Sequence, residues 1–209
     1  MIDAISLETA HLLGDALPSS HRLRYRIFIE RQGYEVPSWR AMEWDQFDTP
    51  RAHYLMWRDE ASQPRAIARM IPTSQPYMIR ELWPDLVEDG KLPDRDDIWE
   101  VSRVGIDRGL DPALRGRVFG ELFCAFAEFG LRCGIAEYLF VTPSRVIAGA
   151  LEDAGVQAER LCAPRRLGRL PVVAARSTVT WEALRRLRRH HRVPGAVLRV
   201  AGDAEALAA

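Results

Sequence analysis

Residues 98–106 read IWEVSRVGI, an apolar run that carries a glutamate and an arginine at its centre and predicts a β-strand. Charges in a buried strand are costly unless they are paired or used. Side chains alternate between the two faces of a strand, so Glu100 and Arg103 point in opposite directions unless a bulge intervenes. If both serve one cleft, the sequence predicts a bulge near Val101 and Ser102.

The segments after this strand predict a long helix and a second strand. The helix spans residues 112–133 and ends at Gly134, and we expect it to pack on the sheet. Its apolar positions include Leu122, Phe123, Phe126 and Phe129. Residues 138–141 are the clearest buried strand, and Pro143 begins a further helix that ends at Gly155.

The rest of the chain alternates between strands and helices in the same way. Further strands are predicted at residues 1–6, 53–58, 65–71, 156–161 and 170–175, and the second and third of these suggest an antiparallel hairpin. Further helices are predicted at residues 7–17, 21–31, 78–87 and 180–191, with Pro18 closing the first. This succession predicts an α/β fold, a three-layer α/β/α sandwich with a mixed sheet. We expect one domain over residues 1–209, with an arginine-rich C-terminal helix at about 180–192.

Composition bounds the possible functions. The chain has 209 residues and a formal net charge of +0 from 29 basic and 29 acidic residues, so no overall field favours nucleic acid or a membrane surface as a partner. No stretch approaches the roughly 20 apolar residues of a membrane span. The three cysteines show no spacing typical of a metal site and fit a reduced compartment. We therefore expect a cytoplasmic protein without a metal or cofactor.

Residues 42–48 read MEWDQFD, with Asp45 and Asp48 three positions apart beside Trp44 and Phe47. Carboxylates among aromatic side chains suit a pocket for a cationic, partly aromatic ligand. An Asx turn or a helix cap explains a single aspartate equally well. On the helix at 21–31, Arg24 lies one turn before Phe28, which places a guanidinium beside an aromatic ring.

Taken together, these residues resemble those of the acyl-homoserine lactone synthases, the LuxI-type autoinducer synthases. The resemblance covers about the first 145 residues. The matching pieces are Arg24 with Phe28, Glu43 with the segment Asp45-Gln46-Phe47-Asp48, Arg69, and Glu100-Val101-Ser102-Arg103. It implies a fold similar to that of the GNAT N-acetyltransferases and a function in quorum-sensing signal synthesis. In that reaction the amine of S-adenosylmethionine attacks an acyl thioester, and the product closes to N-acyl-L-homoserine lactone with release of methylthioadenosine.

The resemblance assigns expected roles to the charged residues. Glu100 is the candidate base, acting through a water, because a partly buried carboxylate near the amine can accept its proton. Arg103 joins it in the catalytic pair. Asp45 and Asp48 either bind the cationic methionine end of S-adenosylmethionine or serve as counter-ions for the arginines, which would grip the substrate carboxylate. The expected S-adenosylmethionine-binding residues are Arg24, Phe28, Tyr34, Trp44, Asp45, Asp48 and Arg69.

A purely structural interpretation stays open beside this one. Arg24, Asp45, Asp48, Arg69, Glu100 and Arg103 would then form a buried ion-pair network that holds the helix, the loop and the sheet together. Each of them would contribute to stability whether or not it touches a substrate.

The acyl pocket is expected between the sheet and the long helix. Its candidate wall residues are Trp83, Val104, Leu122, Phe126, Leu139 and Val141, although residues at such spacings are more often plain core. Val104 stands where the family commonly has phenylalanine, which leaves extra room beside the thioester. Leu139 stands where a threonine often accompanies 3-oxo acyl chains, which argues against a 3-oxo substrate, whereas Thr142 nearby weakens that argument.

Two other functions compete with this one. A GNAT-type N-acyltransferase that uses acyl-coenzyme A on another amine would carry a full glycine-rich phosphate turn, of which Arg117 to Gly120 supplies only the first half. A noncatalytic binding protein would more readily have lost Glu100 or Arg103. The arginine-rich tail leaves acyl carrier protein and acyl-coenzyme A both open as donors.

Overall fold

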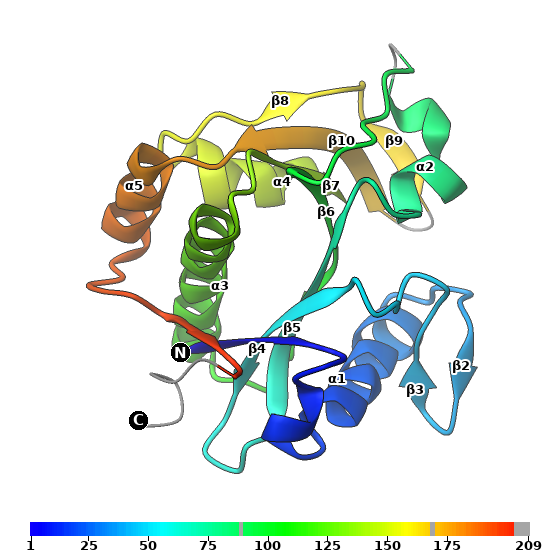
Figure 1. The fold of residues 1–209 in the computed structure, drawn as a ribbon, viewed down its shortest axis with the longest axis vertical. Helices are drawn as coiled ribbons and strands as arrows, with labels where there is room; N and C mark the ends of the chain where they lie inside the picture. Colours follow the sequence, from blue (N-terminus) through cyan, green and yellow to red (C-terminus); the bar gives the residue numbers. More distant parts are fainter. Residues whose placement is uncertain (88–89, 168–169, 203–209) are drawn as a thin grey trace.

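The computed structural model describes residues 1–87, 90–167 and 170–202. Its main element is a nine-stranded mixed sheet in the order β11-β1-β4-β5-β6-β7-β10-β8, with β9 paired to β10 (Figure 1). The strands are β1 (Ile2–Ser6), β4 (His53–Arg58), β5 (Pro64–Pro72), β6 (Ile98–Ile106), β7 (Glu137–Thr142), β8 (Glu159–Arg160), β9 (Arg165–Leu167), β10 (Leu170–Thr178) and β11 (Leu198–Val200). The pairs β1/β11 and β6/β7 are parallel and the others antiparallel. The mixed sheet is therefore confirmed.

Helices cover both faces of this sheet. They are α1 (Ala16–Arg24), which continues as a π-helical segment (Tyr25–Arg31), α2 (Met78–Leu82), α3 (Pro112–Cys133), α4 (Ser144–Ile147), which continues as a second π-helical segment (Ala148–Glu152), and α5 (Trp181–His191). Short 3₁₀ turns lie at Ala10–Leu13 and Pro84–Leu86. A separate two-stranded hairpin is formed by β2 (Ser38–Trp39) and β3 (Met42–Glu43).

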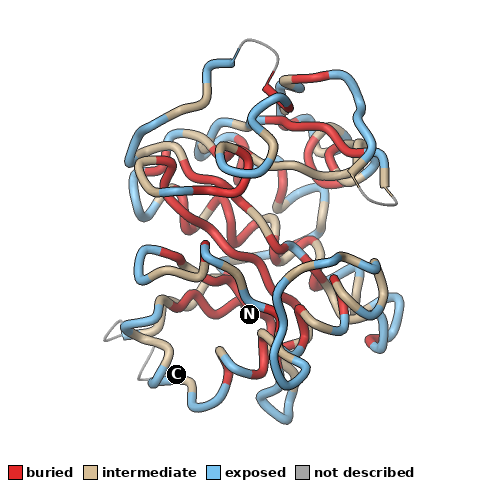
Figure 2. The backbone as a smooth tube through the Cα atoms, turned by 90° about the vertical axis from the view of Figure 1, so that its right-hand side faces the viewer, coloured by how far each residue is buried: buried red, intermediate tan, exposed pale blue. Residues whose placement is uncertain are grey.

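Apolar side chains on β4 alternate between the two faces of the sheet and contribute to both buried layers. Tyr54 and Met56 pack in one apolar cluster with Leu23 and Ile27, whereas the intervening Leu55 packs in a second cluster under α3. Since neighbouring side chains of a strand point to opposite faces, one central strand serves both layers. Figure 2 shows the buried backbone, in red, concentrated along these central strands. The predicted three-layer sandwich is thus confirmed, with Cys124 of α3 in the core.

The predicted strand at 98–106 and helix at 112–133 have the observed bounds of β6 and α3. Asp111 caps α3 by accepting from Ala113 N at 2.9 Å, and Gly134 ends it in the left-handed region with φ of 69°. The hairpin at 53–71 is also confirmed as β4 and β5.

Other boundaries differ from the prediction. Pro18 does not close a helix but lies in the first turn of α1, where its missing N–H costs no helical hydrogen bond. Of the strand predicted at 156–161, only Glu159–Arg160 pairs with β10. The short strands β2, β3, β9 and β11 were not predicted, because two or three residues show no periodicity.

Strands β6 and β7 pair over only part of their length. Parallel pairing runs from Ile98 opposite Glu137 to Val101 opposite Phe140 and then stops. Beyond that point β6 continues along β5, whereas β7 continues along β10 to Thr142 opposite Val173. The sheet therefore opens between β6 and β7, and the side chains at this opening face a cavity described below.

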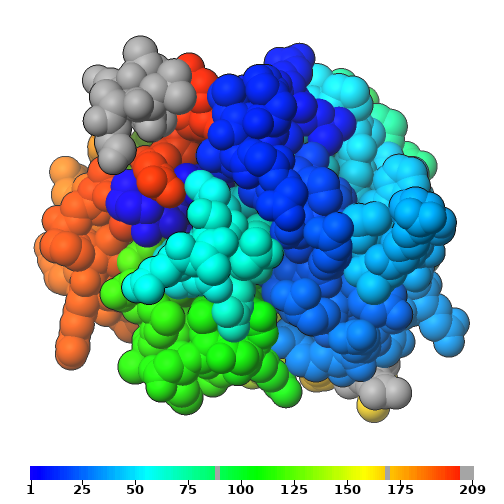
Figure 3. Space-filling model, turned by 90° about the horizontal axis from the view of Figure 1, so that it is seen from below, coloured from blue at the N-terminus to red at the C-terminus, as the bar shows by residue number. Residues whose placement is uncertain are grey.

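The first and last described strands lie side by side. Ile2, Asp3 and Ala4 of β1 pair in parallel with Leu198, Arg199 and Val200 of β11. Figure 3 shows residues near the N-terminus, in blue, against the C-terminal region, in red. Glu128 of α3 holds the approach to β11, because its carboxylate accepts from Leu198 N at 2.9 Å and from Val197 N at 3.0 Å.

No helix in the described ranges is long and apolar enough to cross a membrane.

Candidate active site

Three arginines and three carboxylates meet beneath the β2–β3 hairpin in what we call the ionic cluster. Its members are Arg24, Glu43, Asp45, Asp48, Arg69 and Arg103. Arg24 donates from Nε to Glu43 at 2.5 Å and from its two terminal nitrogens to Asp48 at 2.6 and 3.0 Å. Arg24, Glu43 and Arg69 are fully buried. Three positive and three negative groups balance, so the cluster is neutral as a whole.

The other two arginines of the ionic cluster reach it from the sheet. Arg69 on β5 donates to Asp45 at 2.5 Å and to Ser102 Oγ at 3.1 Å. Arg103 on β6 donates from Nε to Glu43 at 3.1 Å and from a terminal nitrogen to Asp45 at 2.7 Å. The cluster thus joins α1, the hairpin and the sheet, as the structural interpretation predicted for five of its six residues.

Glu43 completes the cluster, and its place follows from the β2–β3 hairpin. Arg40 and Ala41 form the hairpin turn with φ of 49° and 56°, the conformation that a two-residue turn of matching twist requires. The turn returns the chain so that Glu43 points inward next to Arg24. The sequence resemblance included Glu43 without giving it a role, because a hairpin of two-residue strands shows no pattern.

Lowering the pH should weaken the ionic cluster. The pKa of Asp48 determines the direction in which stability changes with pH. Burial alone would raise the pKa of Asp48, but Arg24 and Arg69 hold it well below its ordinary value. A depressed pKa stabilises the fold above the unfolded pKa of about 4, and that contribution is lost as pH falls. We expect the stability gap between the wild type and Asp48→Asn, measured by urea unfolding, to shrink by about 1.4 kcal/mol per unit below pH of about 4. A gap that stays constant from pH 7 to pH 3 would contradict this.

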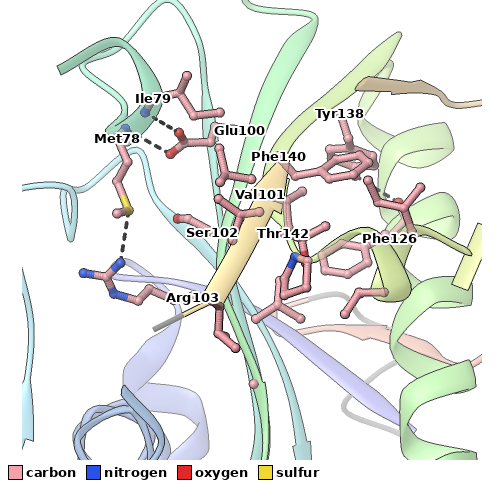
Figure 4. Close-up of a pocket in the computed structure, with 18 of the residues that line it drawn as sticks. Met78, Ile79, Glu100, Val101, Ser102, Arg103, Phe126, Tyr138, Phe140 and Thr142 are labelled. Carbon is pink, nitrogen blue, oxygen red and sulfur yellow. Dashed lines mark hydrogen bonds between the residues drawn. The ribbon is translucent and has the colours of Figure 1, made fainter. Parts of the chain in front are cut away.

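Glu100 lies apart from the ionic cluster. It is 1% exposed and accepts from the backbone N–H groups of Met78, at 3.1 Å, and Ile79, at 2.8 Å (Figure 4). Among the described residues it makes no ion pair, so its predicted membership of the network is wrong. Burial raises the pKa of Glu100, although the two N–H donors and the nearby Arg69 and Arg103 act in the opposite direction. A carboxyl group so placed binds a proton more readily than an exposed one.

A β-bulge brings Arg103 to the face of β6 that Glu100 and Ser102 already share. Ile67 of β5 pairs with Gly105, and Arg69 pairs with Ser102, so two residues of β6 oppose one of β5. The extra residues are Arg103, with φ of 52°, and Val104. The predicted bulge is therefore present, two residues further along than predicted. Without it Arg103 would point away from the cluster.

Met78 connects Glu100 with two arginines of the ionic cluster. Its sulfur lies 3.1 Å from a terminal nitrogen of Arg69. It also lies 3.2 Å from a terminal nitrogen of Arg103 (Figure 4). Sulfur is a weak acceptor, so these two N–H groups are the least well satisfied in the cluster. A substrate oxygen placed there would make a stronger bond than the sulfur does.

A cavity of about 760 Å³ opens between β6 and β7 and extends under α3. Its polar side carries Glu100, Ser102 and Arg103, and its apolar side carries Phe126 and Tyr138 (Figure 4). Phe28 and Tyr34 stack with ring centroids 5.9 Å apart, and both line it. Gly105 allows this packing, because a Cβ there would lie 2.9 Å from Ile27, next to Phe28.

The predicted site residues divide between this cavity and its surroundings. Those that line the cavity are Phe28, Tyr34, Trp83, Glu100, Arg103, Val104, Phe126 and Val141. Those in the ionic cluster behind it are Arg24, Asp45, Asp48 and Arg69. Trp44 is 57% exposed and lies outside the wall, as do two core residues, Leu122 and Leu139.

Several wall residues were not predicted. They include Met78, Ser102, Phe119, Phe123, Tyr138 and Phe140. Helical spacing carried a signal for two of them, since Phe119 and Phe123 lie seven and three positions before Phe126 and share its face of α3. Leu139 instead packs with Tyr77 and Ile79 on the opposite face of the sheet.

Comparison with known proteins gives a consistent result. Residues 11–187 match the model of the family described as autoinducer synthase. The chain is 33% identical over 145 residues to an acyl-homoserine-lactone synthase of Aeromonas salmonicida, covering 68% of this chain and 69% of the relative. It is 30% identical over 142 residues to one of Vibrio anguillarum, covering 67% and 73%.

Solved structures agree with the sequence relatives. A coenzyme A-dependent acyl-homoserine lactone synthase, BjaI, with S-adenosylmethionine and isopentyl-coenzyme A is 27% identical, with a TM-score of 0.87 over 100% of this chain and 97% of that one. An N-acetyltransferase structure from Lactobacillus plantarum, 16% identical over 86% of this chain and 99% of that one with a TM-score of 0.56, shares the fold alone, as expected for a GNAT-like sandwich. This chain therefore belongs to the autoinducer synthase family and is an acyltransferase of the acyl-homoserine-lactone synthase class.

Proposed function

We propose that this enzyme takes its acyl group from an acyl-coenzyme A, transfers it to the amine of S-adenosylmethionine and releases N-acyl-L-homoserine lactone and methylthioadenosine. The observation that carries the proposal is one cavity with a buried carboxylate, Glu100, and a guanidinium, Arg103, beside an apolar wall under α3. The likeness to the coenzyme A-dependent synthase BjaI supports this choice of donor.

Glu100 would act as the base of the acyl transfer. The amine nitrogen attacks the thioester carbonyl, an N–C bond forms, and the C–S bond breaks as the thiol leaves. The amine must lose a proton, and Glu100 would accept it through a water. The raised pKa of Glu100 suits this role, because a general base works best when its pKa is near the pH at which the enzyme operates. The N–H groups of Met78 and Ile79 fix its orientation.

Arg103 would hold the carboxylate of S-adenosylmethionine. Among the described residues, its terminal nitrogen at Met78 has only a sulfur partner, so a carboxylate oxygen would gain a strong bond there. The same carboxylate then attacks the methionyl carbon that bears the sulfonium, which closes the lactone and expels methylthioadenosine. Arg24, Asp45, Asp48 and Arg69 would orient Arg103 and Glu43 from behind the wall, and their direct contact with substrate stays a prediction.

The two ends of the substrates would occupy different parts of the cavity. Phe28 and Tyr34 offer stacked rings to the adenosine, and Arg103 lies 5.6 Å from the Phe28 ring. The acyl chain would lie against Phe126, Val141 and the unpredicted Phe119 and Phe123. Val104 lies at the edge of the wall and Thr142 within it. The extra room beside the thioester and the argument against a 3-oxo substrate both stay predictions.

A donor panel tests the proposal. S-adenosylmethionine is supplied with straight, branched and aryl acyl groups on coenzyme A and on acyl carrier protein, and lactone and methylthioadenosine are followed by mass spectrometry. We expect equal amounts of the two products from at least one acyl-coenzyme A, with higher kcat/KM than from the same acyl group on carrier protein. Lactone from carrier protein alone would overturn the choice of donor, and no lactone from any donor would overturn the synthase reaction.

A further inference from the structure

Three arginines lie where β6 passes into α3, at the edge of the cavity. We call Arg31, Arg108 and Arg115 the edge arginines. Arg31 lines the cavity and donates to Ile106 O at 3.3 Å, and Arg115 in the first turn of α3 donates to Arg108 O at 3.4 Å. The end of the π-helical segment, the loop after β6 and the start of α3 therefore carry the three side chains as neighbours. Arg108 is exposed, and Arg31 and Arg115 are half-buried.

The edge arginines are not neutralised by their surroundings. Asp107 is the carboxylate nearest to them in the chain, and its oxygens already accept from Arg65 Nε at 3.0 Å and from Gly109 N at 2.8 Å. In the described part of the chain, none of the three edge arginines forms an ion pair. Burial and the charges of Arg108 and Arg115 lower the pKa of Arg31 although Asp107 acts in the opposite direction, which agrees with a locally positive potential.

The backbone at this point does not offer an anion site of its own. The carboxylate of Asp111 accepts from the N–H groups of Ala113 and Leu114, so the start of α3 is already capped by a negative group. An anion at this edge must therefore be held by the guanidinium groups. Guanidinium groups match phosphate oxygens in geometry and charge, and several of them offset one capping carboxylate.

The edge arginines are connected to the reaction centre along α3 and β6. Arg115, Phe119 and Phe123 follow each other at intervals of four on one face of α3, and the two phenylalanines line the cavity. On β6, the distance from Ser102 to Ile106 is at most about 13 Å, the value for a regular strand without the bulge. A long, flexible arm can run over this distance from a thioester near Glu100 to an anionic group at the edge.

We propose that the edge arginines bind the phosphate groups of the acyl-coenzyme A donor, and thereby select a donor that carries a phosphorylated nucleotide. This proposal rests on the function proposed above. The thioester would lie at the opening between β6 and β7, the pantetheine arm would follow the aromatic face of α3, and the phosphates would meet Arg108 and Arg115. Arg31 would close the site from the π-helical segment.

Two donors that differ only in their phosphates provide the test. The acyl-coenzyme A that the panel finds best is compared with the matching S-acyl pantetheine, which lacks the phosphates and the nucleotide. In the double variant Arg108→Gln/Arg115→Gln, we expect the KM for acyl-coenzyme A to rise about tenfold or more, because charge-assisted hydrogen bonds are lost. The KM values for acyl-pantetheine and for S-adenosylmethionine should stay unchanged. Added salt should raise the wild-type KM for acyl-coenzyme A only.

Arg117→Gln is the matched control, since Arg117 lies on the same helix, pairs with Glu121 and is 62% exposed. It should leave all KM values as in the wild type. An unchanged KM for acyl-coenzyme A in the double variant, or an equal rise for both donors, would overturn the proposal. So would a rise confined to acyl carrier protein, which would make the edge arginines a protein-docking surface. If the wild type makes lactone from neither acyl-coenzyme A nor acyl-pantetheine, the donor assignment itself has failed, and this outcome is distinct from the others.

Discussion

Replacing Glu100 with glutamine is expected to lower kcat by a factor of about 10² to 10⁴, the usual range for loss of a general base. The amide cannot take up a proton from the amine at neutral pH. KM for S-adenosylmethionine should change much less, because Arg103 and the aromatic rings remain. In the wild type, kcat should rise with pH through the raised pKa of Glu100, since only the carboxylate form acts as base. Glu100→Gln should lose this limb of the profile.

Two measurements separate this expectation from a structural role. Glutamine has one acceptor oxygen where Glu100 accepts two N–H groups, so some loss of thermal stability is expected in either case. Calorimetric binding of S-adenosylmethionine shows whether the cavity survives the substitution. Glu60→Gln, in the exposed turn between β4 and β5, controls for loss of a carboxylate elsewhere. Full turnover by a folded Glu100→Gln enzyme would remove Glu100 from the base role.

Replacing Arg24 with methionine is expected to cost about 3–5 kcal/mol of the free energy of unfolding, the range for breaking a buried ion pair from one side. Arg24 is fully buried and makes three hydrogen bonds to Glu43 and Asp48. Methionine fills a similar volume but leaves both carboxylates in the interior without a full set of partners. Urea unfolding followed by circular dichroism measures the loss.

Arg22→Met is the matched control for this substitution. Arg22 lies two positions earlier on α1, its side chain is 50% exposed, and its contact with Asp15 spans 4.0 Å. Such an exposed pair contributes little, so we expect a change within about 0.5 kcal/mol. Equal losses for the two variants would mean that the ionic cluster does not stabilise the fold as argued.

Features of the fold and the site could be predicted from the sequence where a residue in its local setting has only one physical explanation. A glutamate and an arginine inside an apolar strand have to be paired or used, and both are: Arg103 in the ionic cluster and Glu100 under two N–H donors. The bounds of α3 followed from Asp111, Pro112 and Gly134, whose effects are local. These features depend on neighbours in sequence, so the sequence is enough to find them.

The features that could not be predicted from the sequence depend on residues that are close in space but distant in the chain. Whether Asp45 meets a substrate or an arginine is decided by the hairpin that brings Glu43 inward, and a two-residue strand leaves no pattern in the sequence. Leu139 and Val141 share one parity on β7, yet only Val141 lines the cavity, because the sheet opens at that point. The position of the bulge depends on how β5 and β6 align, which the sequence of either strand alone does not contain.

Because β11 pairs with β1, the edge of the sheet at β1 stays unpaired until β11 has been synthesised. β1 leaves the ribosome before the other strands of the sheet, and its outer edge pairs with residues around Leu198, which are made almost 200 positions later. Until then a growing chain carries an open strand edge, the kind of surface on which nascent proteins pair wrongly with one another. Cells that produce this enzyme therefore have a reason to shield β1 until β11 has been synthesised.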